Sequence, residues 1–273
     1  MLPEDELVER IRAVAGTGDG LVLGIGDDAA VLDGGFVVCC DMLVDGVHFD
    51  SARQSLRQIG ARAAAVNLSD LAAMGAWPVC LLAAFGLPPD SADAGELAAG
   101  MASHGVPLAG GDLSRAAVLT VSVTAVGRAE HPVLRSGGRA GDRLVVTGSL
   151  GAQAVAGFTA EVTPRLREGQ ELATIATAMI DLSDGIARDA GRLARASGCG
   201  ARIDLERLPL AAGATVEQAA AGGEDYELLA ALPGTQPQPS FVTDVGELTG
   251  EGAVLLLDAS GPRHDLAGWD HFQ

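Results

Sequence analysis

Lysine is absent from this 273-residue chain, so all 18 basic residues are arginine. This absence excludes three kinds of site that depend on a lysine amine: the P-loop, the Schiff-base site and the protein-kinase site. Any phosphate chemistry in this protein therefore has to rely on metal ions, arginine side chains and backbone N–H groups.

Cysteine is also scarce, and its positions show neither zinc-ligand spacing nor a CxxC pair. We expect Cys39, Cys40, Cys80 and Cys199 to be small buried residues. Cys39 and Cys40 are adjacent in a strand-like run, which predicts that their side chains point to opposite faces of a sheet.

A net positive charge and long apolar runs are missing as well. The net charge of −18 argues against a nucleic-acid partner, and bound divalent cations would neutralise part of it. No apolar run reaches the roughly 18 residues of a membrane span. The acidic, amphipathic start MLPEDELVERI differs from a signal peptide, so we expect a cytoplasmic location. With 48% hydrophobic and 20% charged residues, the chain is predicted to fold as a globular protein.

The clearest helical pattern contains one residue of the wrong kind. Residues three or four apart predict one helix face: Ile59, Ala63, Val66, Asp70 and Met74. A carboxylate on a buried face needs a cation, hydrogen-bond donors or a proton, so Asp70 is a candidate site residue. The alternative is that Asp70 lies at the edge of the stripe and caps a neighbouring turn.

Other aspartates follow glycines or strand-like runs in the first half of the chain. Asp27 and Asp28 follow LVLGIG, Asp41 follows the apolar run 36–40, and Asp112 follows two glycines. GIGDDA matches a dinucleotide-binding pattern, but too little chain follows it for the required helix, and the carboxylates would repel a pyrophosphate. A metal-binding loop is the better interpretation, with a solvated turn as its alternative.

The second half repeats this combination of glycines and acids. Asp181 and Asp184 lie in IDLSDG, directly before the helical run 186–196. Helix capping is the structural alternative to a site role for these two carboxylates. Gly222 and Gly223 precede the acidic run EDYE, and an apolar strand follows.

Strands and helices alternate along the chain, which predicts a layered α/β fold. The Gly-, Pro- and Arg-rich segment 131–142 is the best candidate boundary, dividing the chain into domains 1–133 and 134–273. We expect these helices: 4–14, 91–103, 152–160, 170–179 and 186–196. We expect these strands: 36–40, ending at Asp41, then 79–86, 106–109, 118–126, 144–147, 201–205, 241–245 and 253–257.

Nine motifs follow one another in an order known from one family. They are GIGDDAAVL, DMLVDGVHF, AVNLSDLAAMGAWP, GGDLSR, LRSGGRAGD, VTGSLG, IDLSDGIARD, GGEDYELL and GWDHF. From about Leu23 to its end the chain resembles the thiamine-monophosphate kinases. The resemblance implies a two-domain fold of the aminoimidazole-ribonucleotide-synthetase-like superfamily, whose N-terminal domain pairs in a homodimer to form a barrel.

The resemblance also implies a reaction. The γ-phosphoryl group of ATP would pass directly to thiamine monophosphate, giving thiamine diphosphate and ADP with the help of several Mg²⁺ ions. Neither nucleic acid nor a membrane is expected as a partner. No phospho-enzyme is implied, which agrees with the missing lysine and the missing nucleophile motif.

Site roles follow from matching motifs. The implied metal ligands are Asp27, Asp28, Asp41, Asp70, Asp112, Asp181 and Asp184. Among these, the resemblance assigns catalysis to Asp70, Asp112 and Asp181. The implied nucleotide contacts are Gly111, Asp112, Arg135 and Ser183. The implied substrate contacts are His48, Glu224 and Trp269, the indole stacking on the cationic thiamine rings.

The chain departs from the family pattern in a few places. Cys39 and Cys40 replace small hydroxyl residues, and thiols are poor Mg²⁺ ligands. Leu113 replaces a threonine, and the connections at 92–105, 157–167 and 210–216 are short. Two alternatives to the kinase therefore stay open: a related ATP-using enzyme with another small-molecule acceptor, and a Mg-nucleotide-binding protein without catalysis.

Overall fold

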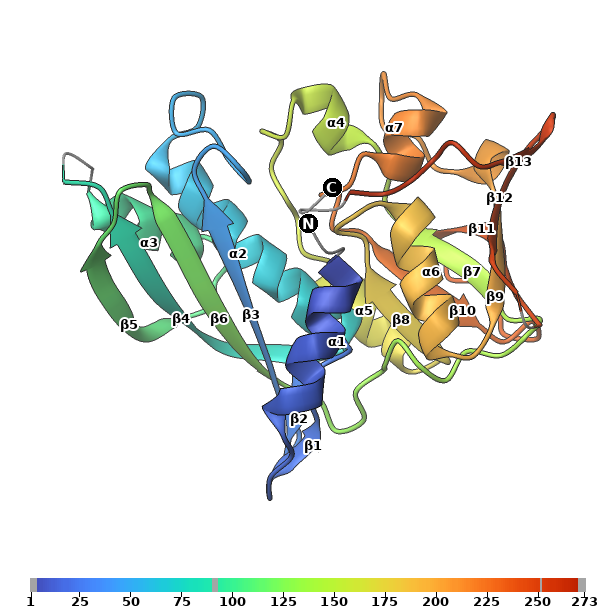
Figure 1. The fold of residues 1–273 in the computed structure, drawn as a ribbon, viewed down its shortest axis with the longest axis horizontal. Coiled ribbons are helices and arrows are strands. Elements are labelled where there is room, and N and C mark those ends of the chain that lie inside the picture. The colour runs from blue at the N-terminus through green and yellow to red at the C-terminus, as the bar shows by residue number, and fades with distance from the viewer. Residues whose placement is uncertain (1–3, 90–92, 251, 270–273) are drawn as a thin grey trace.

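Two β-sheets and one central helix organise the computed structural model, which describes residues 4–89, 93–250 and 252–269 (Figure 1). The helices are α1 Glu4–Ala15, α2 Leu56–Ala73, α3 Ala94–Ala102, α4 Ala152–Ala156, α5 Leu166–Ala173, α6 Ile186–Ala196 and α7 Val216–Ala221, with the 3₁₀ turn η1 Leu205–Arg207. The layered α/β fold predicted from the sequence is confirmed.

The first sheet has six strands in the order β1-β2-β3-β6-β4-β5. Its strands are β1 Leu21–Leu23, β2 Ala30–Leu32, β3 Phe36–Val44, β4 Trp77–Leu87, β5 Leu108–Arg115 and β6 Thr120–Arg128. Only one neighbouring pair, β4 with β5, runs parallel in this sheet. Side chains of β3 alternate between buried and more exposed, so one face of the sheet packs on α2 and the other stays open.

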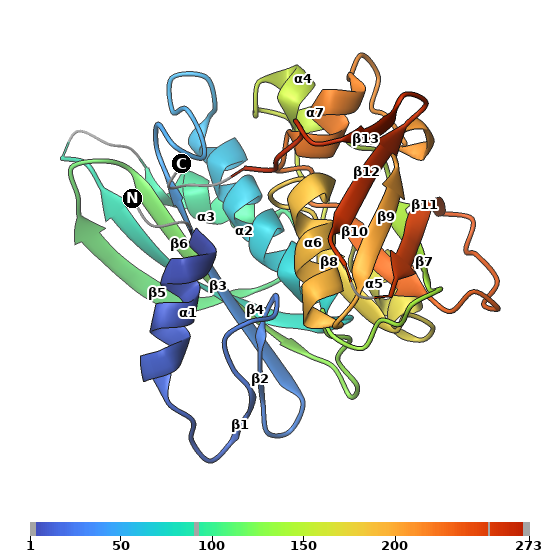
Figure 2. The same cartoon turned by 45° about the vertical axis from the view of Figure 1, so that its right-hand side comes forward.

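Helix α2 is the central helix, and it lies between the two sheets in both views (Figures 1 and 2). It packs against β3, β6 and α3 of the first half and against α5 and β8 of the second. The apolar members of the predicted stripe are buried and Asp70 is half-buried, and most of the remaining helix surface is buried too, because both halves of the chain cover it. Ser55 begins the helix with a capping box that it shares with Gln58.

Small residues allow α2 to approach its neighbours closely. A Cβ atom at Gly60 would lie 2.0 Å from the carbonyl oxygen of Leu97 in α3. A Cβ atom at Gly169 in α5 would lie 2.2 Å from the carbonyl oxygen of Ala72. These glycines let the backbone of α2 touch both halves, and this contact fixes how the two sheets face each other.

The second sheet has seven strands in the order β13-β12-β9-β11-β7-β10-β8. They are β7 Arg143–Thr147, β8 Ala178–Asp181, β9 Gly200–Asp204, β10 Leu228–Leu232, β11 Val242–Thr249, β12 Val254–Asp258 and β13 Gly261–Arg263. Helices α6 and α7 cover one face, and α5 together with the end of α2 covers the other. This sheet is therefore buried on both faces, and its central strands are continuous apolar runs.

Several predicted elements differ from the observed ones. The strand predicted to end at Asp41 continues to Val44, because β6 pairs with it along its full length. The strand predicted to end at Ala109 continues through Gly110, Gly111 and Asp112 to Arg115 as β5. The helix predicted over 170–179 ends at Ala173, and β8 follows. Helix α4 stops early because Gly157 adopts a left-handed conformation, with φ of 61°.

The cysteine prediction is correct in one respect and wrong in another. Cys39 and Cys40 point to opposite faces, as adjacent strand residues must. Only Cys39 is buried, whereas Cys40 is exposed and Cys80 and Cys199 are half-buried. Parts of two predicted segments, residues 91–92 and 270–272, lie outside the described residues. Within the described ranges, no helix has both the length and the apolar character to cross a bilayer.

Candidate functional site

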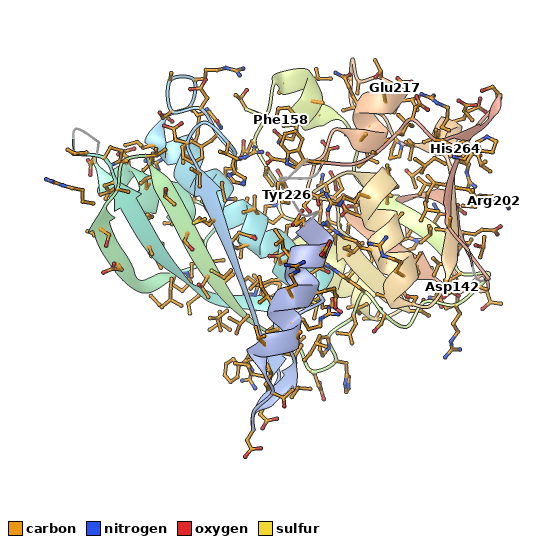
Figure 3. The ribbon with its side chains drawn as sticks, in the orientation of Figure 1. Asp142, Phe158, Arg202, Glu217, Tyr226 and His264 are labelled. Carbon is orange, nitrogen blue, oxygen red and sulfur yellow. The ribbon has the colours of Figure 1, made fainter. Side chains whose placement is uncertain are left out.

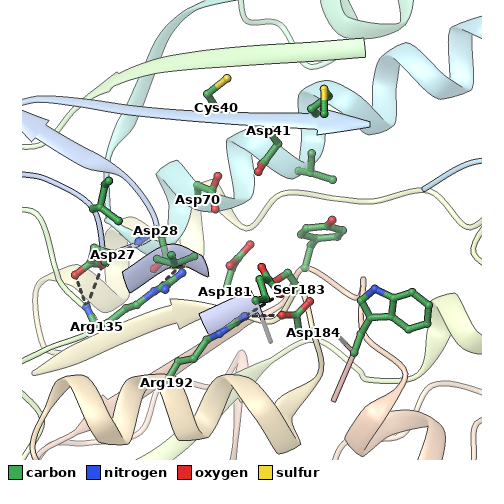
Figure 4. A pocket seen from close by; sticks show the side chains of 18 of the residues that line it. Asp27, Asp28, Cys40, Asp41, Asp70, Arg135, Asp181, Ser183, Asp184 and Arg192 are labelled. Atoms are coloured by element: carbon green, nitrogen blue, oxygen red, sulfur yellow. Dashed lines mark hydrogen bonds and ion pairs between the residues drawn. The ribbon is translucent and has the colours of Figure 1, made fainter. Parts of the chain in front are cut away.

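A cleft of about 730 Å³ opens between the two halves of the chain, and residues from both halves line it. Figure 4 shows aspartate side chains from several separate elements pointing into this cleft. Most of the predicted site residues line it: Asp27, Asp28, Asp41, His48, Asp70, Arg135, Asp181, Ser183, Asp184, Glu224 and Trp269. Predicted site residues from near both ends of the chain, from Asp27 to Trp269, therefore meet at one place.

Three carboxylates form the centre of this site. One carboxylate oxygen from each of Asp28, Asp70 and Asp181 lies within 4.8 Å of the others. Asp28 follows β1, Asp70 lies on α2 and Asp181 ends β8, so the group combines both halves of the chain. Oxygen atoms at this separation can share a single divalent cation.

Polar residues of α2 hold the neighbouring strands in place. Asn67, the single asparagine of the chain, accepts a hydrogen bond from the backbone N–H of Asp41 at 3.0 Å. The Cys39 thiol donates to the Asn67 carbonyl oxygen at 3.2 Å. Ser69 donates to the Asp181 carboxylate at 2.7 Å. Within four residues, α2 therefore fixes Asp41 from one sheet, Asp181 from the other and its own Asp70.

The guanidinium group of Arg135 supplies positive charge beside this cluster. Its guanidinium donates two hydrogen bonds to Oδ1 of Asp28, at 2.6 and 3.2 Å. Its backbone N–H donates to the carboxylate of Asp27 at 3.1 Å. Arg135 thus connects the loop after the predicted domain boundary to the acidic loop of the first half.

Burial and mutual repulsion raise the pKa of several of these carboxyl groups. Burial raises the pKa of Asp70 well above its usual value, and the charges of Asp41, Asp181 and Asp28 raise it further. Burial also raises the pKa of Asp181, followed by the charge of Asp28, whereas the Ser69 hydroxyl opposes the shift. The pKa of Asp27 is raised to about 6 by burial and by Asp28. The cluster therefore disfavours full ionisation unless a cation balances it.

The residues present fit a divalent cation such as Mg²⁺. Every candidate ligand atom is a carboxylate oxygen, which hard cations prefer. Oδ2 of Asp28 is buried, and no described residue donates a hydrogen bond to it. A buried anionic oxygen without a partner is costly, and a bound cation would remove that cost.

Asp184 lies in the same cleft but is paired differently. Its carboxylate forms an ion pair with Arg192 at 2.6 Å, and Arg192 also contacts Asp189 at 2.9 Å. Burial raises the pKa of Asp189 to about 7. The metal role expected for Asp184 stays a prediction, since the structure shows its carboxylate on an arginine.

Gly111 and Asp112 are the two predicted site residues that do not line the cleft. They lie in β5, the edge strand of the first sheet, and both are exposed. The row of paired residues from Asp41 through Val123 and Ala83 ends at Gly111. Three strand spacings separate its ends, roughly 14 Å. Within a single chain, Asp112 is too distant to join the carboxylate cluster.

A second cavity of about 310 Å³ lies beside the cleft. His48, Glu224 and Trp269, the three predicted substrate contacts, line both cavities and so mark their common border. Apolar side chains of Val47, Phe49 and Phe158 line the second cavity. Figure 3 labels Phe158 and shows it between the two halves.

Sequence reasoning missed the residues that support the carboxylates. Asn67, Ser69 and Arg62 are all buried, and each contacts a residue of the site. The sequence does mark these positions, because polar residues interrupt an otherwise apolar helix there. The pattern gave no indication of the strands that would supply their partners.

Comparison with known proteins identifies the family. The model of the AIR synthase related protein, N-terminal domain, matches residues 26–129, and the model of the corresponding C-terminal domain matches residues 139–238. The thiamine-monophosphate kinase of Halobacterium salinarum is 39% identical over 92% of this chain and 96% of its own length. The chain belongs to the thiamine-monophosphate kinase family.

Solved structures support this family assignment. AaThiL complexed with AMPPCP and TMP superposes with a TM-score of 0.88 and 28% identity, covering 99% of this chain and 97% of the other. The thiamine-monophosphate kinase of Stenotrophomonas maltophilia K279a gives a TM-score of 0.74 and 31% identity over 93% of this chain and 96% of its own. The family resemblance and the fold of the single chain expected from the motifs are therefore confirmed, and the dimer barrel stays a prediction.

The raised carboxyl pKa values predict how the metal-free protein responds to pH. An acid whose pKa is higher in the folded chain stabilises that state while protonated, and this contribution is lost as pH rises through the folded value. For Asp27 and Asp189 these values are about 6 and about 7. In EDTA, we expect the apparent Tm to fall by a few degrees between about pH 5 and about pH 8.

Differential scanning fluorimetry measures this fall directly. Asp189→Asn should make it smaller, and Mg²⁺ should raise the Tm more at the higher pH, because deprotonated carboxylates bind the cation. A Tm of the metal-free protein that rises across this pH range would contradict the raised pKa values of these carboxyl groups.

Proposed function

We propose that this protein transfers the γ-phosphoryl group of ATP to thiamine monophosphate, producing thiamine diphosphate and ADP. The observation that supports this function best is the junction of the two cavities. A carboxylate-lined cleft suited to a metal-bound triphosphate meets an apolar cavity suited to an aromatic substrate, and His48, Glu224 and Trp269 lie where they join. Relatives named thiamine-monophosphate kinase, and a related structure complexed with AMPPCP and TMP, agree with it.

We assign the residues of the cleft to nucleotide and metal binding. Mg²⁺ held by Asp28, Asp70 and Asp181, with Asp41 and Asp27 beside them, would neutralise charge on the phosphate oxygens. Arg135 and the loop at Ser183 line the same cleft and would orient the phosphates through their N–H groups and the Ser183 hydroxyl. Residues 1–133 would supply most of the carboxylates, and residues 134–273 would close the cleft.

The substrate would lie across the border of the two cavities. Its aromatic rings would occupy the cavity lined by Phe49, Phe158 and Trp269, where the indole can stack on a cationic ring. Its phosphate would face His48. An oxygen of that phosphate attacks the γ-phosphorus, and the bond from this phosphorus to the β–γ bridging oxygen breaks as ADP leaves. Positioning and charge neutralisation account for the rate, because the attacking oxygen is already ionised.

The two alternatives make different demands on the structure. An enzyme with another acceptor would share the carboxylate cluster but not need an apolar second cavity. The alternative of a protein without catalysis rests on the changes at Cys39 and Cys40 and on the shortened connections. Cys39 nevertheless donates to Asn67, and Asn67 still holds Asp41, so the substitution leaves this arrangement in place. A cytoplasmic location stays a prediction from the sequence.

Turnover with thiamine monophosphate tests the proposed function. Purified protein with ATP and Mg²⁺ should form thiamine diphosphate and ADP in equal amounts, measured by chromatography. Asp70→Asn should lower turnover by at least about a hundredfold, because it removes a charge that balances the cation. Asp33→Asn, an exposed aspartate in a turn, is the matched control and should leave turnover unchanged. ADP without thiamine diphosphate would indicate another acceptor, and ATP binding without any product would indicate the inactive alternative.

We further propose a homodimer that brings Asp112 to the site from the partner chain. The first sheet has two open edges in the described chain: β5 ends the strand order, and β2 covers β3 only from Phe36 to Val38. Open edges pair readily with other strands. Exposed apolar side chains also lie along the strands of this sheet: Phe36, Met42, Trp77, Val79, Leu82 and Leu113.

Pairing of β5 of one chain with the free part of β3 of the other would close both edges under twofold symmetry. Gly111 and Asp112 of the partner chain would then lie beside Asp41. This arrangement would explain why Asp112, a predicted site residue, is exposed in the single chain.

Complementation between two inactive variants tests this arrangement. Asp70→Asn and Asp112→Asn chains, co-expressed with different tags, can be purified as mixed dimers. If Asp112 acts in the partner's site, one of the two sites is free of substitutions, and activity should return to roughly half of the wild-type value. If Asp112 acts within its own chain, both sites carry a substitution, and the mixed dimer should stay inactive.

A further inference from the structure

Arg62 is a buried charge on the central helix that has no part in the reaction described above. Its side chain is 3% exposed. A buried guanidinium persists only where its donors are satisfied. Its partners come from the other half of the chain: the Glu224 carboxylate through an ion pair, and Gln153 Oε1 and the Ala160 carbonyl oxygen, both at 3.3 Å.

Glu224, the partner of this arginine, stands in an unusual backbone conformation. Its φ of 58° lies in the left-handed region, which residues with a side chain rarely adopt. Neighbouring contacts maintain this conformation. Glu224 N–H donates to the Ser183 carbonyl oxygen at 2.6 Å, and Tyr226 N–H donates to the Leu182 carbonyl oxygen at 2.9 Å. A strained backbone held from several sides is typical of a residue fixed for function.

The two carboxylate oxygens of Glu224 have different surroundings. Oε2 accepts the hydrogen bond from Arg62. Among the described residues, none donates a hydrogen bond to Oε1, and Glu224 borders both cavities. Holding one oxygen fixes the rotamer and leaves the other one for a ligand.

We propose that Arg62 is a positioning residue for the substrate: it holds Glu224 so that its second carboxylate oxygen faces thiamine monophosphate. This inference rests on the proposed function. Arg62 itself does not line either of the two cavities, so it acts through Glu224. Arg62 also offsets the negative charge of Glu224. Oε1 would therefore orient the substrate through a directed contact more than attract it through net charge.

A double-mutant cycle tests the proposal by steady-state kinetics. Arg62→Met should raise the KM for thiamine monophosphate about 10- to 100-fold, as expected for a lost charge-assisted contact. The KM for ATP should change less than about twofold, because Arg62 contacts no residue of the carboxylate cluster. Adding Arg62→Met to Glu224→Gln should change kcat/KM for thiamine monophosphate less than about twofold, because the residue that Arg62 positions is already altered.

Two further variants separate positioning from folding. Arg62→Lys keeps the charge but loses the planar fork, so its KM for thiamine monophosphate should lie between those of the wild type and Arg62→Met. It replaces Arg62→Met in the test if that variant is poorly folded. Arg57→Met removes an exposed arginine of the same helix and should change neither KM.

The outcomes distinguish the two proposals. An equal loss from Arg62→Met with and without Glu224→Gln, or an equal rise of both KM values, would overturn the positioning role while the wild type still makes thiamine diphosphate. Absence of thiamine diphosphate with the wild type would overturn the proposed function, and the positioning role with it.

Discussion

Repulsion between buried carboxylates is the constraint on which this structure depends. Asp28, Asp70 and Asp181 bring oxygens within 4.8 Å of one another in a setting that raises the pKa of the last two. Such a group destabilises the fold unless protons, Arg135 or a cation balance it. The protein therefore uses part of the stability of its hydrophobic packing to hold these charges close together.

Helix α2 makes this arrangement possible because both halves of the chain bury it. One side packs on the first sheet and the other on α5 and β8, so polar residues from a single helix reach partners in both halves. Asn67 holds β3, Ser69 holds Asp181 and Arg62 holds Glu224. The same helix thus supports the carboxylate cluster at one level and the border of the two cavities at another, and small residues such as Gly60 allow the close packing.

The sequence predicts the class of fold and most of the cleft, because glycine-acid motifs and apolar periodicity are local signals. Helix α6 is predicted at its observed bounds, and the carboxylate at Asp70 stands out against its apolar stripe. Long-range pairing is not visible in this way. Asp41 was expected at a strand end and lies within β3, because β6 pairs beyond it. Gly111 and Asp112 follow the strand predicted at 106–109, yet they lie inside β5, which pairs with β4 and forms an edge of the first sheet.

The most direct test of this account is a titration with Mn²⁺, followed by electron paramagnetic resonance, in the presence of a non-hydrolysable ATP analogue. We expect Asp181→Asn, in the second half of the chain, to weaken Mn²⁺ binding by at least about tenfold, as Asp70→Asn in the first half should. Asp33→Asn should leave binding unchanged. Equal Mn²⁺ affinity in wild type and Asp181→Asn would contradict a cation site built by both halves.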